Sequence, residues 1–241
     1  ALGMLSLFVL QLTQAFLPLN PQQLPNVETW HLAFNTAASF MTNTNWQAYS
    51  GETTLSYLTQ MLGLTVQNFL SAATGAAVAI ALIRGLVRKN TGELGNFWAD
   101  IIRCTTRILL PICVVATLLL VSQGVIQNLN PYVDVQTVEG AQQTIAMGPV
   151  ASQEAIKELG TNGGGYFGVN SSHPLENPTY LSNMVECWSI LIIPMAMVFA
   201  LGFYSNRKKL AYSIFGVMLF AYLAGVGINV YQEMNGNPRI D

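Results

Sequence analysis

GTNGGGYFGVNSSHPLENPT, residues 160–179, places glycines, amides and hydroxyls between two long apolar runs. Glycine adopts positive φ without strain, so a glycine-rich backbone can turn successive carbonyl groups toward one axis. Irregular backbone is tolerated at membrane depth only where protein or a water-filled cavity covers it. The stretch therefore predicts the lining of a pore if the chain around it spans a membrane.

The composition indicates an all-α integral membrane protein. Apolar residues make up 51% of the chain and charged residues 9%, whereas soluble domains carry about 25% charged residues. A helix needs about 20 apolar residues to cross a bilayer. Five runs serve as candidate spans: residues 1–19, 58–83, 104–127, 182–204 and 210–231. The first run begins without an initiator Met, so we expect a fragment; a cleaved signal peptide is disfavoured because no basic region precedes the run.

The basic residues predict which connections face the cytoplasm. Short loops rich in Lys and Arg stay on the cytoplasmic side of a membrane. Eight of the ten basic residues lie in or beside two connections: Arg84, Arg88, Lys89, Arg103, Arg107, Arg207, Lys208 and Lys209. We therefore expect these two connections inside and the long connections 20–52 and 128–181 outside. Five consecutive spans satisfy this alternation.

The two outside connections share one plan, in which a short helix runs into an amide-rich loop. A period near 3.6 in NVETWHLAFNTAASFM predicts the first helix, which leads into TNTNWQ. Ser152 as a cap and Gly160 as a terminator predict the second, which leads into TNGGGYFG. This recurrence on one membrane face predicts a parallel repeat of span, re-entrant pore helix, filter loop and span. The expected segments are a first pore repeat (1–88, with pore helix 28–41 and filter loop 42–47), a cytoplasmic loop (89–103), a second pore repeat (104–205, with pore helix 152–160 and filter loop 161–168), and the first span of a third repeat with the start of an outside loop (206–241).

The carbonyl and amide oxygens of the two loops favour a monovalent cation. Such oxygens can replace the hydration shell of a weakly hydrated ion, whereas calcium and magnesium normally recruit carboxylates. The C-terminal end of each short helix adds a partial negative charge. Gly163, Gly165 and Gly168 also match a dinucleotide fingerprint, but the strand that should precede it is missing. An exposed flexible turn is the other alternative, and the recurrence of the helix–loop plan disfavours it.

Both loops also resemble those of a known family. FNTAASFMTNTNWQAYSGE (34–52) and the stretch 160–179 are similar to the first and second filter segments of the A subunit of the bacterial Kdp potassium-transporting ATPase. The similarity continues through RKNTGELGNFW and covers essentially the whole chain. It implies a pseudo-fourfold, potassium-channel-like architecture of four repeats around one selectivity filter, of which this chain carries two and the first span of a third. It also implies potassium-binding positions at Asn43, Thr44, Asn45, Thr161, Asn162 and Gly163, with Gln47, Gly164 and Gly165 near the filter.

The same resemblance implies the setting of the chain. The chain would be a multi-pass protein of the bacterial inner (plasma) membrane with its filter loops facing the periplasm, and potassium would be its transported ion, with no organic cofactor. The implied partners are a catalytic P-type ATPase subunit (KdpB), accessory small subunits (KdpC and KdpF) and membrane lipid. The formal net charge of −2 argues against a nucleic-acid partner. Because the chain lacks the D-K-T-G phosphorylation motif, it is expected to be the ion-selecting, non-catalytic subunit of an ATP-driven uptake complex. The alternatives are a Trk/Ktr-type potassium transporter subunit that works without ATP and, less favoured, a membrane enzyme, since neither loop offers paired carboxylates or a nucleophile–base pair.

Isolated polar residues are interpreted as structural where a simple role explains them. His31 and His173 are expected to be hydrogen-bonding groups and not ligands. Glu186, near the outer end of the fourth span, is left open between a functional role and simple contact with water. Three further sets are expected to be structural: Gln67 and Asn68 as interhelical hydrogen-bonding groups, Cys104, Cys113 and Cys187 as small buried hydrophobes, and Pro111 and Pro194 as kinks within spans.

Overall fold

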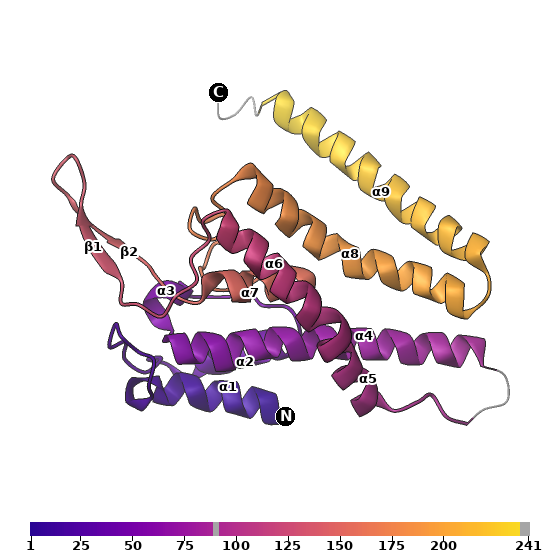
Figure 1. Cartoon of the computed structure of the whole chain (residues 1–241), viewed down its shortest axis with the longest axis horizontal. Coiled ribbons are helices and arrows are strands. Elements are labelled where there is room, and N and C mark those ends of the chain that lie inside the picture. The colour runs from indigo at the N-terminus through magenta and orange to yellow at the C-terminus, as the bar shows by residue number, and fades with distance from the viewer. Residues whose placement is uncertain (89–91, 237–241) are drawn as a thin grey trace. The chain divides into compact units, whose positions relative to one another are not determined.

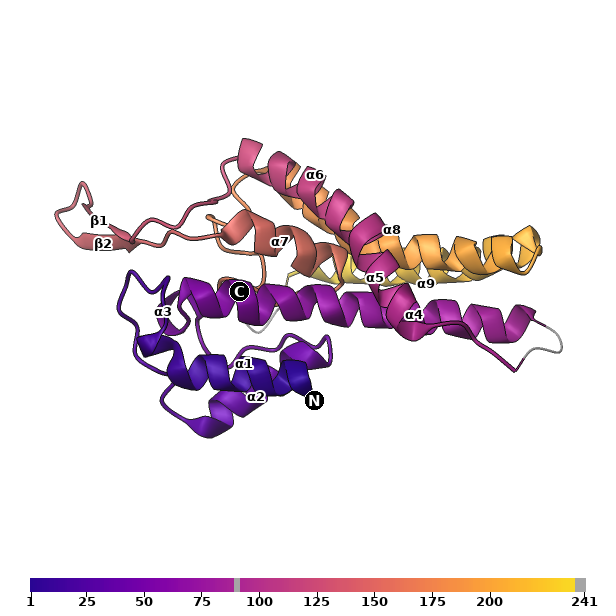
Figure 2. The same ribbon diagram turned by 60° about the horizontal axis from the view of Figure 1, so that its bottom comes forward.

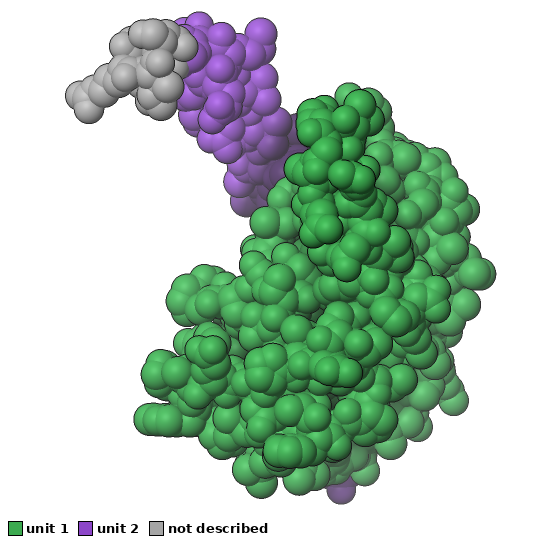
Figure 3. Space-filling view, turned by 90° about the vertical axis from the view of Figure 1, so that its left-hand side faces the viewer, with its two compact units in different colours: residues 1–80, 96–193 green, residues 81–95, 194–241 purple. Residues whose placement is uncertain are grey.

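The computed structural model describes residues 1–88 and 92–236 and is mostly helical (Figure 1). The chain divides into two compact units, coloured separately in Figure 3: Ala1–Ile80 with Asn96–Ile193, and Ala81–Gly95 with Pro194–Asp241. The elements are α1 (Leu2–Thr13), α2 (Trp30–Met41), α3 (Gly51–Thr54), α4 (Val66–Val87), α5 (Phe97–Cys104), α6 (Leu110–Ser122), β1 (Val133–Gln136), β2 (Gln142–Ile145), α7 (Val150–Leu159), α8 (Tyr180–Tyr204) and α9 (Lys208–Met234). A 3₁₀ turn follows α1 at Gln14–Phe16, and π-helical segments precede α4 and α6 at Thr59–Thr65 and Thr105–Leu109.

Four helical stretches are long and apolar enough to cross a membrane: Thr59–Val87, Phe97–Ser122, Tyr180–Tyr204 and Lys208–Met234. They correspond to the second to fifth apolar runs of the sequence, which agrees with an all-α membrane protein. The first run forms a shorter helix than the sequence predicts. The apolar helix covers Leu2–Phe16 and not residues 1–19. Leu17 is extended (φ −97°, ψ 155°), as is usual for a residue before proline, and this conformation ends the helix.

Both prolines expected to lie within spans do so, and one of them follows a π-helical segment that the sequence analysis does not predict. Pro111 lies in the first turn of α6, directly after the π-helical segment Thr105–Leu109. Proline has no backbone N–H to donate, so a local change of hydrogen-bonding pattern accommodates it within a continuous helix. Pro194 lies inside α8.

In the first unit, α1 packs beside α2 and also contacts Thr59–Thr65, the start of the long helix that contains α4 (Figures 1 and 2). The buried apolar residues of this cluster are Leu7, Val27, Ala33, Ala37, Phe40, Leu55 and Leu64. Buried glutamines add polar links between the segments. Gln11 Nε2 donates to the Ala33 carbonyl (3.0 Å), and Gln14 Nε2 donates to the carbonyls of Pro25 and Thr54 (2.7 Å each). These bonds fix the segments that lead into and out of the first loop.

The second outside connection contains a β-hairpin that the sequence analysis does not predict. β1 and β2 pair antiparallel, with Val133 opposite Ile145 and Gln136 opposite Gln142. Most residues of both strands are exposed, so no alternation of apolar and polar residues marks them. The hairpin extends away from the helices of its unit in both ribbon views (Figures 1 and 2).

α7 begins two residues earlier than predicted, and Ser152 is not its cap. The first helical residue is Val150, and the Ser152 hydroxyl donates to the Pro149 carbonyl (3.3 Å). Gln127 Oε1 instead accepts the Ser152 N–H (2.9 Å). Gly160 follows the last helical residue, as predicted. α7 packs against α6 and is almost entirely buried, although it carries two glutamates and a lysine.

In the second unit, the end of α8 packs on the start of α9. The ring of Phe199 contacts those of Tyr212 and Phe215, with centroids 5.6 and 5.3 Å apart. A Cβ added at Gly202 would overlap the Ala211 side chain, so glycine permits this close approach.

Among the basic residues used to orient the chain in the membrane, Lys89 lies outside the described residues.

Candidate functional site

The two loops follow the same backbone path after their helices. After α2, Asn43 (φ 65°) and Asn45 (φ 53°) are left-handed and Thr44 between them is not. After α7, Thr161 (φ 57°) and Gly163 (φ 79°) are left-handed, and the residue between them is not. Asparagine and glycine accept this conformation, but for a β-branched threonine it is strained and directs attention to the site. The same alternation thus occurs twice along the chain.

The hydrogen bonds within the loops repeat at the same spacing. The N–H groups of Thr44 and Asn45 both donate to the Ser39 carbonyl (3.1 and 3.2 Å). The N–H groups of Asn162 and Gly163 both donate to the carbonyl of the residue at the equivalent position of α7, Lys157 (2.8 and 3.1 Å). The N–H and C=O of a trans peptide point in opposite directions. The carbonyl groups that precede these N–H groups therefore point away from the supporting helix.

These four outward carbonyl groups, and the carbonyl groups of Asn45 and Gly163, have no hydrogen-bond donor. Within the described parts of the chain, nothing donates to the carbonyl oxygens of residues 43–45 or 161–163. The neighbouring carbonyls of the second loop are occupied, since Gly164 accepts from Asn45 Nδ2 (3.2 Å) and Gly165 accepts from Gln47 Nε2 (2.8 Å). Loops normally satisfy most buried carbonyl groups. The six free oxygens are therefore available to an ion or to water.

Amide side chains tie the two loops together. Gln47 makes a pair of bonds with Gly165, because its Oε1 also accepts the Gly165 N–H (3.0 Å). Asn162 Nδ2 donates to Asn43 Oδ1 and to the Ser71 hydroxyl (2.9 Å), and Ser71 also donates to Asn43 Oδ1 (2.7 Å). The side chains of Asn43 and Asn162 thus bond to each other and to α4. The oxygens left for a ligand are backbone carbonyls and two buried side-chain oxygens, Asn45 Oδ1 and Asn162 Oδ1, which have no partner among the described residues.

Asn68 is a structural hydrogen-bonding group, but it bonds to a loop residue and not, as the sequence analysis expects, to another helix. Asn68 Oδ1 accepts from Asn45 Nδ2 (2.7 Å), so α4 supports the first loop directly. Both residues are almost fully buried. His173 is also structural: its ring stacks on Phe167 with centroids 4.0 Å apart, and its Nδ1 accepts the Leu175 N–H (3.1 Å).

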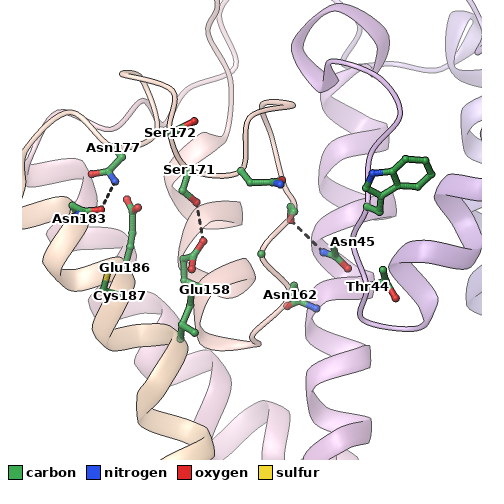
Figure 4. Close-up of a pocket in the computed structure, with 15 residues that line it drawn as sticks. Thr44, Asn45, Glu158, Asn162, Ser171, Ser172, Asn177, Asn183, Glu186 and Cys187 are labelled. Atoms are coloured by element: carbon green, nitrogen blue, oxygen red, sulfur yellow. Dashed lines mark hydrogen bonds between the residues drawn. The ribbon is translucent and has the colours of Figure 1, made fainter. Parts of the chain in front are cut away.

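A cavity of about 770 Å³ borders the two loops (Figure 4). The loops contribute Thr44, Asn45, Trp46, Asn162, Gly163 and Gly164 to its lining. The start of α8 forms another wall with Asn183, Glu186 and Cys187, and Figure 4 shows the second loop between this wall and the first loop. Glu186 is 4% exposed, and its Oε1 has no hydrogen-bond partner among the described residues. Cys187 is exposed, so the expectation that all three cysteines are buried is wrong for this one.

Of the residues proposed from the sequence, the structure brings most to this one place. Thr44, Asn45, Asn162, Gly163 and Gly164 line the cavity. The others adjoin them through bonds between the loops or along the chain: Asn43 with Asn162, Gln47 with Gly165, and Thr161 between Gly160 and Asn162. The Thr161 N–H donates to the Glu158 carbonyl (3.0 Å), which continues the end of α7 into the loop.

A buried ionic cluster behind the second loop was not predicted. Lys157 Nζ lies 2.5 Å from Glu154 Oε2 and 3.0 Å from Glu176 Oε1, and these three side chains are fully buried. The Ser171 hydroxyl lies 2.7 Å from Glu154 Oε1 and 2.8 Å from Glu158 Oε1. The only sequence signal is the Glu154–Lys157 spacing of three, which is common on solvated helices. The sequence does not reveal that this helix is buried.

Burial and charge set the pKa values in this cluster. Burial raises the pKa of the Glu154 carboxyl well above its usual range, and Lys157 opposes that shift. Burial lowers the pKa of the Lys157 ammonium, but the carboxylates of Glu154 and Glu176 raise it by more, so it stays charged. Burial also raises the pKa of the Glu158 carboxyl. The cluster therefore combines a charged lysine with two carboxyl groups, Glu154 and Glu158, whose pKa values burial raises.

The chain is similar to known proteins over its whole length. The family model described as the potassium-transporting ATPase A subunit matches residues 1–241. Potassium-transporting ATPase potassium-binding subunits of Yersinia pestis (strain Pestoides F) and Yersinia pseudotuberculosis serotype O:3 (strain YPIII) are each 56% identical to it over 239 residues. These matches cover 99% of this chain and 42% of each relative, so the chain spans less than half the length of the curated relatives it matches.

Proposed function

Since the chain belongs to the family of the potassium-transporting ATPase A subunit, we propose that its two loops bind potassium and select it against other cations. The observation that carries this proposal is the set of six carbonyl oxygens at residues 43–45 and 161–163 that have no donor among the described residues. Carbonyl oxygens can replace the hydration shell of potassium. The names of the relatives, which are called potassium-binding subunits, support the choice of ion.

The architecture that we propose is a repeat of span, re-entrant helix, filter loop and span. Two copies and the first span of a third would lie in this chain, as part of a pseudo-fourfold arrangement. The equivalent backbone and hydrogen bonds of the two loops support this repeat. α2 and α7 end directly before their loops, at Met41 and Leu159, so the partial negative charge of each helix end lies next to the proposed ion.

The proposed setting is an ATP-driven uptake complex in the bacterial inner membrane. The chain would be the ion-selecting, non-catalytic subunit, and the partners would be a P-type ATPase catalytic subunit (KdpB) and the small subunits KdpC and KdpF. The family match supports this role over a Trk/Ktr-type transporter that works without ATP. No observation favours a membrane enzyme.

The distribution of basic residues supports loops that face the periplasm. A cysteine introduced as Gln142→Cys, in a background without native cysteines, is expected to react with an impermeant thiol reagent in intact cells. Gly92→Cys is expected to be protected, because it lies in a basic connection. The reverse pattern would contradict the orientation of both loops.

The ion site is tested by locating the ion itself. A structure of the full-length complex in rubidium or thallium, compared with one in sodium, is expected to show density for the heavy ion beside the carbonyls of residues 43–45 and 161–163. Density for the heavy ion elsewhere, with these oxygens bound to protein donors, would remove the loops from the site.

A further inference from the structure

We propose that Lys157 is a positioning residue for the second loop. Its buried, ion-paired side chain holds residues 161–165 in the conformation that turns the free carbonyl groups of residues 161–163 toward the ion. The inference rests on the proposed function, because it assigns a role in the same site. Lys157 does not touch the ion in this scheme. It acts through the loop backbone and through Glu176.

The stem of Lys157 lies directly against the loop backbone. A Cβ added at Gly165 would overlap Lys157 Cδ and would lie 3.1 Å from Nζ and 3.2 Å from Cε. Gly165 is also bound to Gln47 through both its N–H and its carbonyl. It is therefore held by the first loop and packs on the lysine at the same time. A shift of the lysine moves the backbone that closely follows the three proposed ligands.

The ammonium group links α7 to the chain that leaves the loop. Lys157 Nζ bonds to Glu154 on α7 and to Glu176 Oε1 beyond the loop. Glu176 also accepts the N–H groups of Phe167 (3.2 Å) and Ser171 (3.3 Å). One carboxylate thus holds both the lysine and the exit of the loop. Supporting groups locked by bonds of their own are what keep a binding geometry within about 0.5 Å of its productive form.

The first loop has no such support, which argues that the cluster serves the second loop specifically. Ser39 occupies the position in α2 that Lys157 occupies in α7, since each carbonyl accepts two loop N–H groups. The Ser39 hydroxyl has no hydrogen-bond partner within the described part of the chain. The first loop is held instead by its own amide side chains, Asn45 and Gln47. Glycines at 163–165 provide no such side chains, so the second loop depends on the lysine behind it.

The test uses the full-length complex and separates positioning from stability. Removing one member of a buried ion pair leaves an unpaired charge, whereas replacing both members with neutral groups is often tolerated. We therefore compare Lys157→Met with the double variant Lys157→Met/Glu176→Gln. Assembly is measured by size-exclusion chromatography and thermal melting. Ion preference is measured by the potassium, rubidium and sodium dependence of transport and by rubidium binding.

The double variant is expected to assemble. Its preference for potassium over sodium is expected to fall about tenfold, because a displaced loop fits the ion less well. A purely structural lysine predicts the opposite, namely normal ion preference once assembly is restored. Wild-type preference in the assembled double variant would overturn the proposal.

Gly165→Ala decides the matter if neither Lys157 variant assembles. It keeps every charge, and its methyl group displaces the lysine stem from the loop side. A changed ion preference is expected, and an unchanged preference would overturn the proposal. Gly163→Ala serves as the reference for the proposed function. If it alters ion preference while the Lys157 double variant does not, only the positioning role fails; if it has no effect, the filter assignment fails and this inference fails with it.

Discussion

The two loops reach one backbone geometry by different means. In the first, residues 43–47 carry three amide side chains, and those of Asn45 and Gln47 extend to the carbonyls of Gly164 and Gly165. In the second, the residues at 163–165 are glycines, which can offer only backbone. The side chains of Asn45 and Gln47 therefore hold the second loop, and its glycines cannot return this support; only Asn162 does so, by donating to Asn43 Oδ1.

The comparison shows why a glycine-rich loop needs groups behind it. A backbone without side chains can bring carbonyls close together, but it has more conformational freedom to lose when it is ordered. Here Gln47 restrains the second loop from one side, and the buried pair of Lys157 and Glu176 restrains it from the other. Disturbing the contact between the loops should therefore do more harm than disturbing either loop alone.

Gly164→Ala is expected to reduce transport the most, because Gly164 lies at the contact between the two loops. A Cβ at this position would overlap the Asn45 carbonyl oxygen, one of the six proposed ligands, and would lie 2.7 Å from Asn45 Cβ. Transport by the full-length complex in potassium-limited cells should fall by roughly a hundredfold, since a shift near 1 Å can cost that much. Gly75→Ala is the matched control, because a helical glycine with no atom within 4 Å of the added Cβ should tolerate alanine. Normal uptake by an expressed Gly164→Ala complex would show that the loops do not meet as described.

Gln47→Arg should have the next largest effect, because it removes two bonds between the loops and adds a positive charge near the ion. A fixed charge about 4 Å from the cation costs on the order of 1 to 4 kcal/mol, depending on the local dielectric. Apparent potassium affinity should therefore fall by roughly tenfold or more. Gln47→Met removes the same bonds without the charge, so the difference between the two variants isolates the electrostatic part. Unchanged affinity in both would remove Gln47 from the site.

Most of the helices and the irregular backbone of both loops could be predicted from the sequence, because the patterns that indicate them are local. The length of the apolar runs predicts four of the spans, and the 3.6 period predicts α2 within two residues of its start. The amides and glycines after each short helix predict irregular backbone, and both loops have it. Long periodic segments and turn residues carry their structure in neighbouring positions.

The groups that distinguish the two loops could not be predicted in the same way. Lys157 and Glu176 lie 19 residues apart and meet only in the folded chain. A helix with the sequence SQEAIKEL is ordinarily solvated, and only its packing against α6 makes its charges buried. The β-hairpin and the π-helical segments also leave no periodic signal in the sequence. Contacts of this kind depend on tertiary structure and not on local propensity.

Gly163→Ala is expected to have a smaller effect than Gly164→Ala, and the pair separates backbone strain from steric overlap. Gly163 has φ +79°, but no atom lies within 4 Å of an added Cβ. The cost is therefore strain alone, roughly 1 to 2 kcal/mol. The complex should fold and transport, with an altered preference among potassium, rubidium and sodium. Gly140→Ala, at φ +87° in the hairpin turn with equal space, is the control and should leave ion preference intact. An equal loss of transport at positions 163 and 164 would contradict this separation.

Ser39→Ala should have the smallest effect, and it tests the asymmetry between the loops most directly. Ser39 and Lys157 both support their loops through the backbone carbonyl, which alanine retains. The Ser39 hydroxyl is buried and finds no partner among the described residues, so its removal should change the free energy of unfolding by no more than about 0.5 kcal/mol, or should stabilise the protein slightly. Ion preference should stay at the wild-type value, measured in the same transport assay as the Lys157 variants. If Ser39→Ala shifted ion preference as far as the loss of Lys157, side chains behind both loops would matter equally. The second loop would then have no special dependence on its buried lysine.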